Sequence, residues 1–96
     1  MKPSEALRNR RDAVVQTASS IGAYNVWVFG SVSRGEDAGG SDLDLLVDVP
    51  RGFTLLDMVR LQSSVENELG VPVDVRTAYD IPVRFRERVA REAKPI

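Results

Sequence analysis

Two aspartates, Asp42 and Asp44, follow the dipeptide Gly30-Ser31 after an interval of ten residues. Because side chains alternate along a β-strand, these carboxylates point the same way where the chain is extended. Their charges repel each other, and a divalent cation removes that conflict. Mg²⁺ prefers oxygen ligands and is commonly held by one or two carboxylates together with substrate phosphates. A Gly-Ser turn offers N–H groups and a hydroxyl to phosphate oxygens. The pattern therefore predicts a site for Mg²⁺ and a nucleoside triphosphate.

Asp74 and Arg34 are two further candidates for this site. Asp74 interrupts the apolar run at residues 71–75, and an aspartate in such a strand calls for a partner. Arg34 follows the Gly-Ser turn and offers a planar cation suited to phosphate. Each also has a plainer interpretation, because Asp74 could face solvent at a sheet edge and Arg34 could serve only solubility. Asp42 and Asp44 could likewise be ordinary solvated carboxylates at the start of a strand.

Three apolar runs must position these residues. Residues 25–29 form a β-branched and aromatic run that ends at Gly30, and the next run spans residues 43–49. For Gly30 to meet Asp42, the first two strands must be antiparallel neighbours. A whole helix separates the second strand from the third, at residues 71–75, so that pair is expected to be parallel through a right-handed crossover. The expected sheet is small and mixed, with about three strands.

Helical patterns before and between these strands indicate an α/β (α+β) class, with helices flanking the sheet. Residues 4–20 carry apolar side chains at helical spacing. Thr54 is a good cap for a second long helix, which Gly70 is expected to end. A last helix is expected shortly after Asp80. Its inward face is predicted to consist of Phe85, Val89 and Ala93.

Composition narrows the possible functions. The 96 residues are expected to form a single domain, residues 1–96. A formal net charge of -1 argues against direct nucleic-acid binding, which usually needs a positive excess. The chain has no Cys and no His, which excludes disulfides, thiolate metal sites and histidine catalysis. No membrane span or signal peptide is recognisable, so a cytoplasmic protein without a membrane partner is expected.

The motif as a whole resembles the nucleotidyltransferase superfamily that includes DNA polymerase β. The similarity extends from about residue 24 to residue 76, and the closest branch is the minimal nucleotidyltransferase (MNT) group. This resemblance implies the nucleotidyltransferase fold and a transfer reaction with pyrophosphate as the leaving group. It rests on Gly30-Ser31, Arg34-Gly35, Ser41-Asp42, Asp44 and Asp74.

The resemblance also implies a role for each motif residue. The three aspartates would bind two Mg²⁺ ions and form the catalytic set. The remaining positions would hold the triphosphate of ATP. Because the chain has no His, Asp74 is the best candidate to accept or relay the proton of the acceptor hydroxyl. The catalytic and metal-binding set is therefore Asp42, Asp44 and Asp74, and the nucleotide-binding set is Gly30, Ser31, Arg34 and Ser41.

The acceptor is the least constrained part of the prediction. Larger members of the superfamily append an acceptor-binding domain, so a partner protein is expected to bring its hydroxyl to the open sheet edge near Asp74. The MNT resemblance implies an antitoxin that transfers AMP to a tyrosine of a HEPN-type RNase toxin. Two alternatives stay open: a free-standing transferase that modifies a small-molecule hydroxyl and needs an acidic acceptor pocket, and a non-catalytic module that neutralises a toxin by contact alone.

Overall fold

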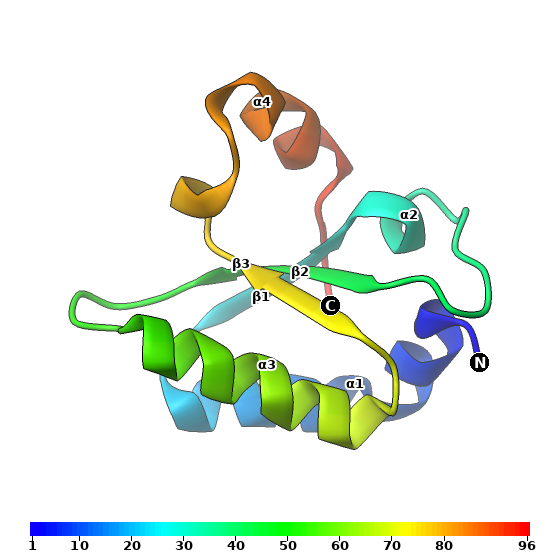
Figure 1. The fold of residues 1–96 in the computed structure, drawn as a ribbon, viewed down its shortest axis with the longest axis horizontal. Helices are drawn as coiled ribbons and strands as arrows, with labels where there is room; N and C mark the ends of the chain where they lie inside the picture. The colour runs from blue at the N-terminus through cyan, green and yellow to red at the C-terminus, as the bar shows by residue number, and fades with distance from the viewer.

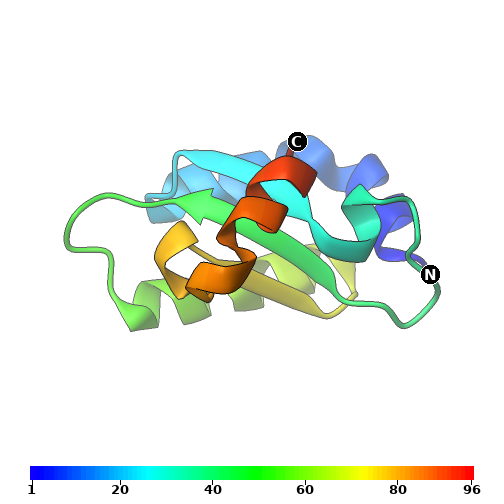
Figure 2. The same ribbon diagram turned by 90° about the horizontal axis from the view of Figure 1, so that it is seen from above.

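A mixed β-sheet with helices on both faces makes up the computed structural model, which describes residues 1–96. The elements in chain order are α1 (Pro3–Ile21), β1 (Asn25–Phe29), α2 (Gly30–Ser33), β2 (Leu43–Asp48), α3 (Leu55–Leu69), β3 (Val73–Arg76), the 3₁₀ turn η1 (Ala78–Asp80), α4 (Val83–Glu92) and β4 (Lys94–Pro95). The sheet order is β3-β2-β1-β4. Helices α1 and α3 cover one face of the sheet, and α4 lies over the other (Figures 1 and 2).

The strand pairing follows the prediction. β1 and β2 are antiparallel neighbours, and β2 and β3 are parallel. The register places Phe29 opposite Asp44, and Asp44 beside Asp74. Side chains of directly paired residues lie on the same face of a sheet. The register therefore aligns the predicted carboxylates across neighbouring strands.

The expectation of about three strands was one strand short. Residues Lys94 and Pro95 form β4, which pairs antiparallel with Val28 and Trp27 of β1. Two residues carry no alternating pattern, and proline is a poor strand residue because it cannot donate a ladder hydrogen bond. Proline is nevertheless compatible with an edge strand, and β4 is the edge beside β1. The third strand also begins at Val73 instead of residue 71, after Pro72.

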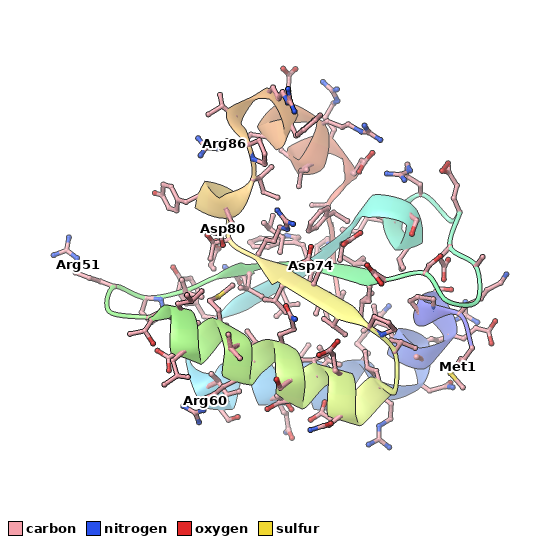
Figure 3. The ribbon with its side chains drawn as sticks, in the orientation of Figure 1. Met1, Arg51, Arg60, Asp74, Asp80 and Arg86 are labelled. Carbon is pink, nitrogen blue, oxygen red and sulfur yellow. The ribbon has the colours of Figure 1, made fainter.

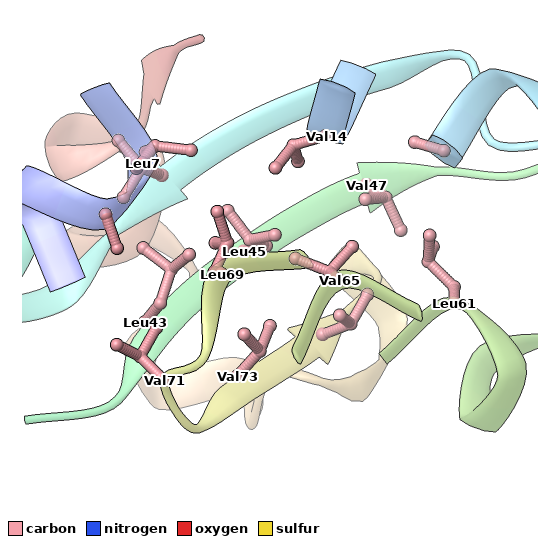
Figure 4. Packing of buried hydrophobic residues seen from close by; sticks show 14 of the residues in the cluster. Leu7, Val14, Leu43, Leu45, Val47, Leu61, Val65, Leu69, Val71 and Val73 are labelled. Atoms are coloured by element: carbon pink, nitrogen blue, oxygen red, sulfur yellow. The ribbon is translucent and has the colours of Figure 1, made fainter. Parts of the chain in front are cut away.

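The hydrophobic core fills the space between the sheet and helices α1 and α3 (Figure 4). Alternate residues of β2 point into it and are almost fully buried, as are Val14 of α1 and both Leu61 and Val65 of α3. The alternation leaves the intervening β2 residues on the opposite face. The strand residues of this core are Val28, Leu43, Leu45, Val47, Val73 and Val75.

Helix α4 differs from the prediction. It has no buried residue, and Phe85, which was expected to face inward, is 40% exposed. Polar contacts connect its end to α2, because the Ser33 hydroxyl donates to the backbone carbonyl of Glu92 and Lys94 Nζ donates to the carbonyl of Ser33. The apolar spacing was real, but α4 covers a face of the sheet that carries charged groups.

The ends of α3 confirm the predicted signals. The Thr54 hydroxyl accepts a hydrogen bond from the backbone N–H of Asp57, and the Asp57 carboxylate accepts one from the N–H of Thr54. This reciprocal pair is a capping box. Gly70 ends the helix with a left-handed φ of 69°. None of the helices in the chain combines the length and the apolar character that a membrane crossing requires.

Candidate active site

Asp44 and Asp74 are paired on neighbouring strands and line the pocket between the sheet and α4. Figure 3 shows Asp74 on strand β3. Both aspartates are partly buried, and the Asp74 side chain is 40% exposed. Asp42 immediately precedes β2 and is exposed. The structure thus pairs two of the three predicted carboxylates, Asp44 of β2 and Asp74 of β3. The third, Asp42, lies just before the start of β2.

The turn after β1 requires a glycine at position 30. Its φ of 71° is a left-handed conformation that side chains other than glycine rarely adopt. In addition, a Cβ at this position would collide with Oδ2 of Asp44. The turn therefore packs directly against one of the predicted carboxylates, and the close approach depends on the missing side chain.

The carboxylate of Asp44 is influenced by its surroundings and by the two neighbouring aspartates. Burial raises the pKa of Asp44 above its usual value, and the charges of Asp74 and Asp42 raise it further. The cations Arg76 and Arg34 oppose this effect without cancelling it. A site that raises a carboxylate pKa disfavours the charged form, so a bound cation would be stabilised there.

Arg76 is a site residue that the sequence analysis missed. Its Nε donates to Oδ2 of Asp74 at 2.9 Å, and this hydrogen bond raises the pKa of Arg76. Strand alternation could have revealed it, because residues two apart on β3 share a face. In this structure Arg76 satisfies Oδ2, while Oδ1 of Asp74 makes no hydrogen bond.

Arg34 lies at the end of α2 and is engaged by two carboxylates. Its Nε donates to Glu36 Oε1 and its Nη1 donates to Glu92 Oε1, both at 3.1 Å. Arg88 of α4 also donates to Glu92 Oε1, at 3.1 Å. Burial opposes the charge of Glu92, but the hydrogen bonds from Arg88 and Arg34 outweigh it and hold the pKa of Glu92 below its usual value. Two guanidinium groups are thus held at one rim of the site.

Ser31 and Ser41 occupy the loop elements next to these residues. Ser31 is a half-buried residue of α2, directly after Gly30. Ser41 stabilises the loop before Asp42, because its Oγ accepts from the N–H of Ala38 at 2.9 Å and its own N–H donates to the Ala38 carbonyl at 3.0 Å. Of the residues predicted to bind the nucleotide, Gly30, Ser31 and Arg34 therefore follow β1 directly, and Ser41 lies just before β2.

A pocket of about 280 Å³ lies between the sheet and α4. It joins Asp44 and Asp74 with the Gly30 turn and the arginine rim in one space, whereas Asp42 does not line it, and the arginine of its α4 side was not predicted from the sequence. Apolar side chains of β1 and α4 also line it. The lining residues that carry the argument are Phe29, Gly30, Asp44, Asp74, Phe85 and Arg88.

The donor set fits Mg²⁺ in its chemistry. All three aspartates offer the hard oxygen ligands that Mg²⁺ prefers. No group of three acidic side chains is gathered closely enough to hold a metal ion by itself. Mg²⁺ usually keeps several waters and shares its ligands with substrate phosphates, so one or two carboxylates suffice for it.

The pairing of Asp44 with Asp74 beside the Gly30 turn agrees with the family resemblance of the sequence. The chain belongs to the nucleotidyltransferase domain family, whose model matches residues 8–96. It is 40% identical over 72 residues to a Methanocaldococcus jannaschii protein assigned as a protein adenylyltransferase, covering 75% of this chain and 77% of that protein. It is 35% identical over 72 residues to the protein adenylyltransferase MntA of Thermococcus cleftensis, covering 75% and 73%.

Solved structures give the same family and fold. A structure assigned as a minimal nucleotidyltransferase is 49% identical, with a TM-score of 0.86 over 97% of this chain and 95% of that one. A toxin-antitoxin structure with AMP-PNP shares the fold, with a TM-score of 0.76, 17% identity, and coverage of 88% of this chain and 69% of that one. The chain is therefore a nucleotidyltransferase with the minimal nucleotidyltransferase fold.

Proposed function

We propose that this nucleotidyltransferase moves AMP from ATP to a hydroxyl of a partner protein and that the reaction depends on Mg²⁺. The observation that carries the proposal is the pairing of Asp44 with Asp74 beside the Gly30 turn. The two relatives described above are assigned as protein adenylyltransferases, which supports AMP as the transferred group. The neighbour with AMP-PNP supports an adenine nucleotide as the substrate.

The triphosphate is proposed to lie along the turn after β1. Gly30 permits close approach of the backbone, and the hydroxyl of Ser31 is a hydrogen-bond donor to phosphate. Arg34 would exchange one of its carboxylate partners for a phosphate oxygen, which matches the same planar fork. Ser41 holds the loop that leads to Asp42, so we propose that it supports nucleotide binding by fixing that loop.

Asp42, Asp44 and Asp74 are proposed to hold Mg²⁺, with two ions at the full site. When bound, Mg²⁺ supplies charge neutralisation at the phosphates and lowers the pKa of an acceptor hydroxyl. The residues themselves contribute a preformed arrangement. Burial and the neighbouring charges disfavour the anionic form of Asp44, and a cationic ligand would stabilise that form.

The proposed transfer is a displacement at the α-phosphorus of ATP. The acceptor oxygen forms a bond to that phosphorus, the bond to the oxygen bridging the α- and β-phosphates breaks, and pyrophosphate leaves with that oxygen. The acceptor proton passes to Asp74, whose Oδ2 is held by Arg76 while Oδ1 makes no hydrogen bond. Arg76 thus orients the carboxylate that receives the proton.

The partner is proposed to be a HEPN-type RNase toxin, and the acceptor a tyrosine of that toxin. The toxin-antitoxin assembly of the structural neighbour supports a toxin partner, and the family resemblance supports the HEPN type. In this proposal the chain acts as the antitoxin in the cytoplasm, where ATP is available. Modification of the toxin, and not contact alone, would silence it.

Intact-mass spectrometry of the toxin tests this proposal. A HEPN-type RNase from the same genome is incubated with the chain, ATP and Mg²⁺, and we expect its mass to increase by AMP and its RNase activity to fall. Asp44→Asn and Asp74→Asn should abolish both changes. A toxin that is silenced without added mass, and equally well by the two variants, would show that binding alone neutralises it.

A further inference from the structure

A second and larger hollow, which we call the β3 groove, lies on the other side of Asp74. It has a volume of about 500 Å³, within the usual range for ligand sites. Its walls come from the start of α3 and from η1, and its floor comes from β3. Asp74 and Arg76 line both this groove and the pocket beneath α4. The β3 groove is therefore continuous with the candidate active site at the carboxylate proposed to accept the proton.

The outer edge of β3 is closed to strand addition. β3 is the edge strand beside β2, and an unpaired edge normally offers its N–H groups to another strand. Here the N–H of Val73 donates to Glu66 Oε2 at 3.1 Å, and the N–H of Val75 donates to Gln62 Oε1 at 3.3 Å. Two side chains of α3 thus occupy the donors that β-augmentation requires. A partner must instead bind this region through side-chain contacts.

The rim of the β3 groove carries exposed apolar side chains. Leu55 is 81% exposed and Val59 is 53% exposed, and the two lie one turn apart on α3. Tyr79, which precedes the lining residue Asp80 in η1, is 88% exposed. Exposed apolar groups gathered around one hollow are typical of a protein-binding surface. Side chains at i and i+4 form the ridge against which a second helix packs.

The β3 groove carries charges of both signs. Asp80 Oδ2 accepts from both the N–H and the hydroxyl of Thr77, and Asp74 Oδ2 accepts from Arg76. Arg76 adds a positive charge to the lining. An aminoglycoside-like acceptor would need a clear surplus of acidic groups at this position.

We propose that the β3 groove binds an amphipathic helix of the acceptor protein, with the apolar face of that helix against Leu55 and Val59 and its hydroxyl next to Asp74. The inference rests on the proposed function, because it names the acceptor segment for the same reaction. It assigns the nucleotide to the pocket beneath α4 and the acceptor to the β3 groove, and both are lined by Asp74. The contacts described above exclude strand addition, and a lining with charges of both signs does not favour a small cationic acceptor.

The test uses a peptide of about 20 residues, long enough to form a helix, with leucines at helical spacing and one tyrosine. A permuted peptide of the same composition lacks the periodicity, and N-acetyltyrosinamide presents the hydroxyl alone. Fluorescence anisotropy measures peptide binding, and labelled ATP measures transfer to each acceptor. The wild-type chain should bind the helical peptide about tenfold more tightly than the permuted one.

Leu55→Arg and Val59→Arg replace exposed side chains, and Tyr24→Arg is the matched control outside the groove lining, where Tyr24 is 64% exposed. The first two variants should lose about tenfold in binding and in transfer to the helical peptide. ATP binding and transfer to N-acetyltyrosinamide should be unchanged, and the control should behave like the wild type. Equal binding of both peptides, or equal behaviour of all three variants, would overturn the inference.

The outcomes separate this inference from the proposed function. If no acceptor receives AMP but helical-peptide binding still depends on Leu55 and Val59, the β3 groove is a helix-binding surface and the transfer proposal fails. If transfer to N-acetyltyrosinamide proceeds and neither peptide binds through these two residues, the transfer proposal stands and the groove inference fails.

Discussion

On the face of the sheet toward α1 and α3, strand side chains are apolar and nearly inaccessible, whereas the face toward α4 carries carboxylates and guanidinium groups. Leu45 and Asp44 are neighbours on β2, yet Leu45 is 1% exposed within the core and Asp44 borders the pocket beneath α4. Helix α4 has no buried residue, whereas α3 buries three. One face of these strands thus supplies the stability of the fold, and the other face carries the site. Because side chains alternate along a strand, a substitution should affect either stability or chemistry, according to the face on which its side chain lies.

The largest expected effect is the loss of transfer in Asp44→Asn. Removing the charge at the centre of the carboxylate row should lower the rate by about 10³-fold or more, because electrostatic stabilisation is lost there. The thermal midpoint should stay the same or rise slightly, since burial and the charges of Asp74 and Asp42 disfavour the wild-type anion. Single-turnover kinetics and a thermal scan of the same preparation measure both effects. Retained transfer would place the chemistry elsewhere.

Leu45→Ala should show the opposite behaviour. Deleting this buried side chain leaves a cavity in the core and should cost about 2–5 kcal/mol of unfolding free energy. Urea unfolding measures the loss. At a temperature where the variant is still folded, its affinity for ATP should stay near that of the wild type. A large drop in affinity with little loss of stability would contradict the division between the two faces.

Gly30→Ala should affect both stability and ATP binding. The turn has a backbone conformation that favours glycine, and it packs against the Asp44 carboxylate. A side chain at a φ of 71° is strained, which costs about 1–2 kcal/mol, and its Cβ would displace the Asp44 carboxylate. We expect the loss of ATP-binding free energy to exceed the loss of unfolding free energy. Gly39→Ala is the matched control, since its φ is not positive and nothing lies within 4 Å of an added Cβ. Similar ATP affinities for the two variants would argue against the role of the Gly30 turn.

The smallest expected effect is a pH dependence of stability caused by Asp44. Its folded-state pKa is raised, so the native state binds the proton more tightly than the unfolded state. The contribution of Asp44 to stability is therefore greatest below the ordinary Asp pKa of about 3.9 and falls as pH rises through the raised value. The stability of Asp44→Asn relative to the wild type should increase over that interval. A difference independent of pH would show that the carboxylate is not perturbed.

The strand signals in the sequence were sufficient for one half of the site. Alternation in residues 43–49 and the Gly30 stop fixed which side chains share a face, and the structure pairs Asp44 with Asp74 as the topology required. Alternation of this kind predicts the strand pairing because packing of the core face fixes the register. The capping residues Thr54 and Gly70 were predictable for the same reason, since they act on their own helix.

The other half of the site depends on contacts between distant segments. Glu92 meets Arg34 across 58 positions of sequence, and no periodicity encodes such a pair. The predicted inward residues Phe85 and Val89 of α4 do line the pocket above the sheet, beside Phe29, but no residue of α4 is buried there. Arg76 could have been found from its parity with Asp74, but its role as the partner of that carboxylate follows only from the observed hydrogen bond.

The most direct test of the division between the two faces is calorimetric titration of the chain with ATP. We expect binding in the presence of Mg²⁺, no binding after the metal is removed by a chelator, and loss of binding in the double variant Asp42→Asn/Asp44→Asn with an unchanged far-ultraviolet spectrum. Equal affinity without Mg²⁺, or full affinity in the folded double variant, would contradict the assignment of the α4 face as a metal-dependent nucleotide site.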